Sequence, residues 1–79
     1  MKNIRTFKVT FFDKNMDVFK VETFHNVSNQ GAFCEHIAIL IDTLELAEVV
    51  RCVDSEDVNY SEAVNHFLKY DLAEIRENA

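Results

Sequence analysis

The sequence contains a single glycine, no proline and no tryptophan in 79 residues. Because glycine and proline punctuate turns and linkers, their scarcity leaves little room for long loops. A glycine-rich phosphate-binding loop cannot be built with one glycine, which excludes nucleotide-dependent chemistry of that kind. Two cysteines are also too few for a disulfide framework. The chain is therefore expected to be compact, and neither a nucleotide-dependent enzyme nor a disulfide-stapled module.

The chain also lacks an apolar run of the roughly 20 residues that a membrane-spanning helix requires. The densest run, residues 37–46, is interrupted by Asp42 and Glu45. The positive charges near the first residue are not followed by the apolar core of a signal peptide, because Lys8 and Asp13 interrupt it. We therefore expect no membrane association and a cytoplasmic location.

The composition that remains is that of a folded single domain spanning residues 1–79. Apolar residues make up 48% of the chain and include seven phenylalanines, whereas disordered chains are poor in aromatic residues. A domain of this length buries only about 60% of the surface that its unfolded chain exposes. Its core is thin, so an oligomeric state or a bound partner would add stability.

Three segments have the pattern of β-strands. Residues 4–12 and 17–25 alternate between two sides and are separated by a turn signal at 13–15, which predicts a β-hairpin. Residues 49–53 are short and β-branched, which favours a third strand with Arg51 pointing outward.

Two other segments have the spacing of amphipathic helices. One helix is expected to begin at 26–28, and the second is expected to be capped by Asn59 or Ser61. The expected core-facing residues are Phe33, Ile37, Leu40, Ile41 and Leu44 in the first helix and Val64, Phe67, Leu68, Leu72 and Ile75 in the second. The element order is then ββαβα. The simplest arrangement is an α+β fold with a three-stranded antiparallel sheet and both helices packed on one face.

No constellation of residues supports catalysis or a cofactor. The candidate ligands and nucleophiles are two cysteines and three histidines, of which only Cys34 and His36 are close in sequence. Two residues apart on a helix, they point about 200° from each other and cannot chelate one metal ion together. Cys34 and Cys52 are expected to be reduced, buried thiols. We therefore expect no metal, no cofactor and no enzymatic activity.

The net charge of −6 is distributed unevenly. Residues 1–42 carry five acidic and five basic side chains, whereas residues 43–79 carry nine acidic and three basic ones. An acidic surface disfavours nucleic acid and favours a basic protein partner. We interpret the acids around the third strand as a partner-binding patch, formed by Glu45, Glu48, Asp54, Glu56, Asp57 and Glu62. The alternative is a solvated surface that keeps a small protein soluble.

A second candidate surface is the sheet face opposite the helices. If the predicted register holds, basic and aromatic side chains share this face, as in some RNA-binding sheets. The residues expected there are Phe12, Val18, Lys20, Phe24 and Arg51, with Lys8 and Thr10 beside them. Such a face could stack RNA or single-stranded DNA, although the overall charge opposes phosphate binding, or it could contact a protein.

Three further residues do not fit the expected core. Ile39 and Leu46 lie off the apolar stripe of the first helix, so we expect them to be covered by another element or to contact a second copy in a homodimer. Asp71 falls within the apolar stripe of the second helix, where a carboxylate needs water or a basic neighbour. The alternative is that Asp71 contacts a binding partner.

The element order resembles that of small acidic inhibitors encoded by phages and other mobile elements, such as antitoxins and anti-CRISPR proteins. The resemblance rests on the strand Phe7–Phe12, a short turn, a second strand ending in Glu22–Phe24, one helix and the strand at 49–53, and it covers residues 4–53. It is a likeness of element order and charge, and it carries no residue roles. It implies a stoichiometric blocker of the working surface of a host protein.

The first functional hypothesis is thus a non-catalytic protein-binding module that acts as an inhibitor through its acidic second half. The alternatives are an RNA- or single-stranded-DNA-binding domain that uses the outer sheet face, and a structural subunit of a larger assembly.

Overall fold

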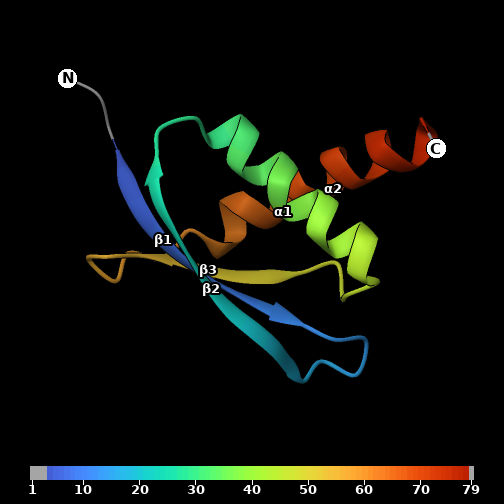
Figure 1. Cartoon of the computed structure of the whole chain (residues 1–79), viewed down its shortest axis with the longest axis horizontal. Helices are drawn as coiled ribbons and strands as arrows, with labels where there is room; N and C mark the ends of the chain where they lie inside the picture. The colour runs from blue at the N-terminus through green and yellow to red at the C-terminus, as the bar shows by residue number, and fades with distance from the viewer. Residues whose placement is uncertain (1–3, 79) are drawn as a thin grey trace.

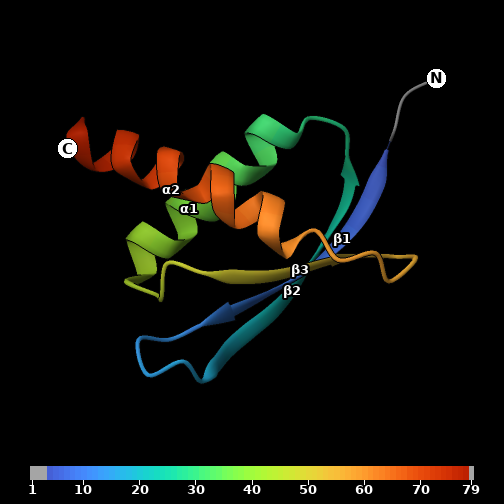
Figure 2. The ribbon, with the colours of Figure 1, turned by 180° about the vertical axis from the view of Figure 1, so that it is seen from behind.

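The computed structural model describes residues 4–78 and places five elements in the predicted order ββαβα. The strands are β1 (Arg5–Phe12), β2 (Val18–Val27) and β3 (Val50–Asp54), and the helices are α1 (Gln30–Leu44) and α2 (Ser61–Glu77). The antiparallel sheet has the order β2-β1-β3, and both helices lie on one side of it (Figure 1, Figure 2). The expected α+β fold is confirmed.

The central strand β1 explains why one face of the sheet is covered. Phe7, Val9 and Phe11 are each at most 2% exposed and point toward the helices. Lys8 and Thr10 alternate with them and point to the opposite face, as the two-residue period of a strand requires. The core therefore forms between the inner side of β1 and the two helices.

Aromatic rings connect the sheet to both helical segments. The ring of Phe7 stacks on that of Phe33 in α1, with 5.0 Å between the centroids. It also meets the ring of Tyr60, at the start of α2, edge-on at 5.4 Å. Ile37 of α1 and Leu68 of α2 are fully buried beside this group. Phe7 thus links the sheet to α1 and to the start of α2.

The predicted faces of β2 are partly wrong. Phe24 pairs with Phe7 and Lys20 pairs with Phe11, so both point toward the helices and not to the outer face. Val18 nevertheless pairs with Phe12 and does lie on the outer face. The physical reason is a bulge between these pairs, where one extra residue of β2 interrupts the alternation. On the outer face, the regular part of β2 therefore presents Val21 and Thr23 where Lys20 and Phe24 were expected.

Two residues of the predicted apolar stripes are exposed instead of buried. Leu44 is 45% exposed and Phe67 is 55% exposed, so neither belongs to the core. Leu46 follows the first of the two alternatives expected for it, cover by another element, because it is only 4% exposed and packs in the core. Only Ile39 of the two expected dimer contacts is exposed.

The sharp turn after α1 is the reason that Leu46 is buried. Glu45 adopts the left-handed conformation, with φ of 53° and ψ of 47°. The Leu46 N–H then donates to the Ile41 carbonyl at 3.0 Å, and the Glu45 N–H donates to the Asp42 carbonyl at 3.4 Å. These two bonds form a Schellman motif, which brings the second residue after the helix back against its last turn. Glycine is the usual residue at the position that Glu45 occupies.

Replacing Glu45 by glycine is expected to stabilise the protein by about 1 kcal/mol, because glycine adopts the left-handed conformation without a Cβ clash. The measurement is the free energy of unfolding in urea. Glu45→Ala removes the same charge but keeps the Cβ atom, so it should bring no such gain. Equal stabilisation by both variants would contradict the backbone explanation.

The start of α1 is later than expected, because β2 continues to Val27. Asn29 is the N-cap, and its Oδ1 accepts a hydrogen bond from the Ala32 N–H at 3.0 Å.

The outer edge of β3 is closed by side chains of α2. The Oδ1 of Asn65 accepts from the Val50 N–H and its Nδ2 donates to the Val50 carbonyl, both at 2.9 Å. The Cys52 N–H donates to Ser61 Oγ at 2.8 Å, and the Cys52 carbonyl accepts from the Tyr60 N–H at 2.8 Å. These bonds replace the neighbouring strand that β3 lacks.

Candidate protein-binding surfaces

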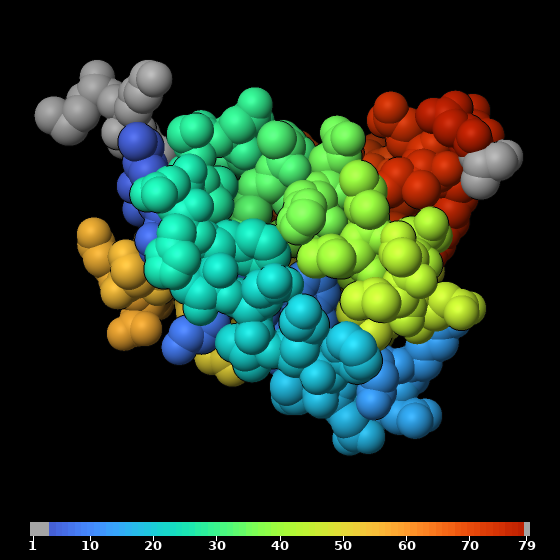
Figure 3. Space-filling model, viewed as in Figure 1, coloured from blue at the N-terminus to red at the C-terminus, as the bar shows by residue number. Residues whose placement is uncertain are grey.

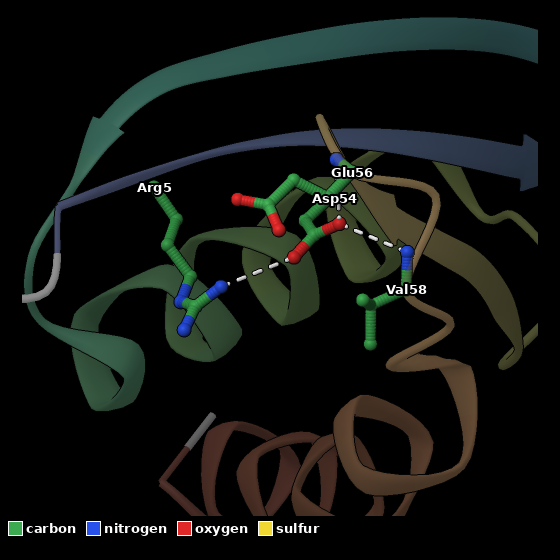
Figure 4. Close-up of polar contacts among 4 residues, drawn as sticks. All are labelled: Arg5, Asp54, Glu56 and Val58. Atoms are coloured by element: carbon green, nitrogen blue, oxygen red, sulfur yellow. Dashed lines mark hydrogen bonds and ion pairs between the residues drawn. The ribbon is translucent and has the colours of Figure 1, made fainter.

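Asp54 does not belong to the predicted acidic patch, because its side chain is only 2% exposed. One carboxylate oxygen accepts from the N–H groups of Glu56 and Val58 at 2.9 Å each, and the other pairs with Arg5 Nη1 at 3.1 Å (Figure 4). The carboxylate thus holds the turn after β3 to the start of β1. Its role in the structure is to fix this turn, which corrects the prediction that it contacts a partner.

The environment of Asp54 makes stability depend on pH. Burial alone would raise the pKa of its carboxyl, but the N–H groups of Val58 and Glu56 and the charge of Arg5 outweigh burial and lower it. A lowered pKa in the folded state contributes stability above the ordinary value, and this contribution is lost as the pH falls through the folded pKa.

Asp54→Asn is therefore expected to destabilise the protein at neutral pH, and the difference from the wild type should shrink below about pH 4. Urea unfolding at several pH values measures it, with the exposed Glu56→Gln as the control. A difference that is the same at pH 7 and at low pH would contradict the ion-pair explanation.

The structure divides the five other predicted acids into two groups. Glu45 and Glu48 precede β3, whereas Glu56, Asp57 and Glu62 follow it. The five residues of β3, which span about 14 Å, lie between Glu48 and the turn that holds Glu56 and Asp57. The first group is partly neutralised as well, because Glu48 accepts from Arg76 Nη1 at 2.8 Å. The predicted acids therefore do not form one continuous patch.

A different set of carboxylates does converge, in a hollow between the helices. Glu35 of α1 lines this hollow with Asp71 and Glu74 of α2. Burial raises the pKa of Asp71, and the charges of Glu35 and Glu74 raise it further. Within residues 4–78, the ion pairs of basic side chains involve other acids. Water or a partner, and not a basic side chain of the described chain, therefore faces Asp71.

Exposed aromatic side chains continue this acidic hollow along α2. Phe67 is 55% exposed and Tyr70 is 65% exposed. Phe67 lies one turn before Asp71, and Tyr70 lies one turn before Glu74, so all four share one flank of the helix. We call Glu35, Phe67, Tyr70, Asp71 and Glu74 the acidic–aromatic face.

Sequence reasoning found only part of this face. Asp71 was identified because a carboxylate interrupts an apolar stripe. Phe67 was assigned to the core by the same stripe. Glu35 was missed because it lies in the electrically neutral half of the chain, and only the packing of α1 against α2 brings it to Asp71.

The outer sheet face keeps Phe12, Val18 and Arg51 of the predicted set, while Lys20 and Phe24 point to the other side. Phe24 packs edge-on against Phe33 with 5.4 Å between the ring centroids. The proposed stacking surface for nucleic acid thus loses one of its two aromatic side chains.

Both cysteines are buried thiols, as predicted. Burial is the largest cause that raises the pKa of Cys52 to about 11, and the neighbouring Cys34 and Asp54 add to it. Burial and the charge of Asp71 raise the pKa of Cys34 in the same way. Both groups are therefore protonated thiols at neutral pH.

The geometry defines a small α+β domain with two candidate surfaces, the acidic–aromatic face and the outer face of the sheet. The chain matches no protein-family model, and no curated protein or solved structure is significantly similar to it. Among residues 4–78, neither helix has the length and apolar character needed to cross a membrane. Function must therefore be inferred from the geometry and charge of the chain itself.

Proposed function

We propose that the chain is a non-catalytic protein-binding module, an inhibitor of the kind that phages encode, which covers a basic surface of a host protein in the cytoplasm. The observation that carries the proposal is the acidic–aromatic face, where three carboxylates converge and two exposed aromatic rings, both packed against the His66 ring, lie on the same flank of α2. A basic surface that normally binds nucleic acid would supply the positive charge that Glu35, Asp71 and Glu74 lack.

The composition of this face suits protein recognition. Tyrosine and other aromatic side chains are enriched at the energetic centres of protein interfaces, and Phe67 and Tyr70 are already exposed for this purpose. Carboxylates around them would steer a basic partner and make the association rate sensitive to salt. Phe67 and Tyr70 would thus provide the apolar contact with a partner, and the carboxylates around them would provide the charge that attracts it.

Burial, together with the nearby charges of Glu35 and Glu74, makes the ionised Asp71 carboxylate costly for the free protein, and this cost predicts the behaviour of Asp71→Asn. The raised pKa of Asp71 means that its ionised form is disfavoured in the folded state at neutral pH, and the penalty disappears as the pH falls toward about 4. Asp71→Asn should therefore stabilise the free protein by about 0.5 kcal/mol at pH 7, and gain nothing at low pH. Urea unfolding at both pH values is the measurement, and destabilisation at pH 7 would contradict it.

The function is tested by recovering the partner from the native host with tagged protein and comparing charge-reversed variants. Asp71→Lys combined with Glu74→Lys is expected to reduce recovery of a basic partner at least about tenfold, since tenfold corresponds to only about 1.4 kcal/mol. Glu56→Lys combined with Asp57→Lys changes the net charge equally but lies in the turn after β3, and it should reduce recovery far less. Urea unfolding verifies that both variants fold.

Three results would contradict the proposal. Equal loss with both double variants would show that only net charge matters. A complex that persists unchanged at high salt would remove electrostatic steering. Undiminished recovery with Asp71→Lys and Glu74→Lys would remove the acidic–aromatic face from the mechanism.

A further inference from the structure

The two edge strands of the sheet differ in whether other residues cover them. The edge of β3 is closed by α2, but within residues 4–78 no strand or side chain is hydrogen-bonded to the outer edge of β2. Three apolar residues beside this open edge, Val18, Phe19 and Val21, are 61%, 50% and 53% exposed. The space-filling view shows β2, in cyan, as an uncovered ridge along its face of the molecule (Figure 3). An unpaired edge with exposed apolar residues is a template for another strand.

The hydrogen bonds of the sheet identify which backbone groups of β2 are free. The N–H groups of Val50 and Cys52 point away from β1, toward α2. Because backbone groups alternate along a strand, Arg51 faces β1 and pairs with Thr10.

The same alternation continues across β1 into β2. If the backbone groups of Thr10 face β3, those of Val9 face β2 and pair with Glu22. The N–H and C=O groups of Val21 and Thr23 then point away from β1, into the space beside the open edge. They are the groups that an added strand would bind.

We propose that the added strand is β2 of a second copy of this chain. The two β2 strands would run antiparallel about a two-fold axis perpendicular to the sheet, with Val21 on the axis. The two sheets would join into one continuous sheet, and both helical layers would lie on the same side. This dimer goes beyond the proposed function and uses a different part of the surface.

The charges of β2 select both this partner and this register. Lys20 and Glu22 flank Val21 and point to the same side of the sheet. With Val21 on the axis, each Lys20 lies directly opposite the partner's Glu22, in the close, non-hydrogen-bonded type of pair. Centring the axis on Lys20 or on Glu22 would place like charges opposite each other, and centring it on Thr23 would place Glu22 opposite the partner's Phe24. The strand is thus complementary to itself in the register centred on Val21.

The existing ion pair leaves the two side chains partly exposed. Within one chain, Lys20 Nζ lies 3.6 Å from Glu22 Oε2, and the two side chains remain 44% and 37% exposed. Glu22 Oε2 is itself buried and has no hydrogen-bond partner within residues 4–78, so the carboxylate can accept a further hydrogen bond only through its other oxygen or after a side-chain rotation. A second strand would bring another ammonium group to each carboxylate and cover the apolar residues beside them.

Sedimentation of the full chain over a range of concentrations tests the pairing. The wild type is expected to form a dimer. Lys20→Glu should raise the dimer dissociation constant about tenfold or more, because two attractive pairs per dimer become repulsive. Glu22→Lys should do the same, and the double exchange Lys20→Glu with Glu22→Lys should restore the dimer. An exposed ion pair contributes little to folding, so the single variants should remain folded.

Cross-linking tests the register. Cα atoms of a hydrogen-bonded pair lie about 5.5 Å apart, within the range that a disulfide bridges. Val21→Cys should therefore form a covalent dimer on oxidation. Thr23→Cys should not, because the two Cα atoms would be more than about 7 Å apart. The native Cys34 and Cys52 are buried, so they should not compete.

Several outcomes would overturn the proposal. A wild type that stays monomeric at every concentration would show that the edge is free or takes a strand from another protein. A dimer that withstands Lys20→Glu would lie elsewhere, for example at Ile39 on α1. Preferential cross-linking of Thr23→Cys would establish a different register. Because none of these variants alters the acidic–aromatic face, a failed dimer leaves the proposed function untouched.

Discussion

Phe7→Ala is expected to lose about 4 kcal/mol of unfolding free energy, the largest effect of any single substitution considered for this chain. Phe7 is 2% exposed and contacts Phe33 by stacking and Tyr60 edge-on. Its loss would leave a cavity between β1, α1 and the start of α2, and remove two aromatic contacts. Domains have about 0.05–0.15 kcal/mol of stability per residue, or about 4–12 kcal/mol for 79 residues, so this cost is at least about a third of the total.

Urea unfolding followed by circular dichroism measures this loss, with Phe67→Ala as the matched control. The control removes the same atoms from a side chain that is 55% exposed, and it should cost less than about 1 kcal/mol. Similar costs for both variants would mean that Phe7 is not the centre of the core, or that Phe67 is more buried than the structure shows.

Asn65→Ala is expected to destabilise the protein by about 2 kcal/mol, because it leaves two buried backbone groups without partners. Val50 is 2% exposed, and both its N–H and its carbonyl bind the Asn65 amide. Alanine favours helix more than asparagine does, so the substitution alone should strengthen α2 locally. A net loss would therefore come from the bonds to β3.

Hydrogen exchange separates this explanation from a general weakening of the fold. Asn65→Ala should accelerate exchange of the Val50 amide more than that of amides in α1. Lys69→Ala, on an exposed position of the same helix, is the control and should change stability by less than about 0.5 kcal/mol. Unchanged protection at Val50 would contradict the role assigned to Asn65.

Local periodicity was enough to predict the order of elements, but not the faces of every strand. The alternation of β1 is continuous, and its inner and outer residues follow directly from the sequence. In β2 the bulge interrupts the alternation, and no residue near it marks the interruption as glycine would. Lys20 and Phe24 were therefore assigned to the wrong face.

The predicted acidic patch was wrong for a related reason. The order of charged residues along the sequence does not show which of them are buried or which lie close together in space. Asp54 looked like part of an acidic run, yet three hydrogen-bond donors surround it. Glu35 looked unremarkable, yet the packing of the helices sets it beside Asp71. Asp71 could be identified from the sequence only because it is a charged residue at a position where the helical spacing predicts an apolar one.

The closed edge of β3 has a consequence for how far the protein can assemble. A sheet with two open edges can add copies at both ends without limit and grow into a fibre. Here Ser61 and Asn65 occupy one edge, so within residues 4–78 the edge of β2 is the one left for strand pairing. The sheet of the proposed dimer would therefore stop growing at two copies, because Ser61 and Asn65 block the edge of β3 in each of them.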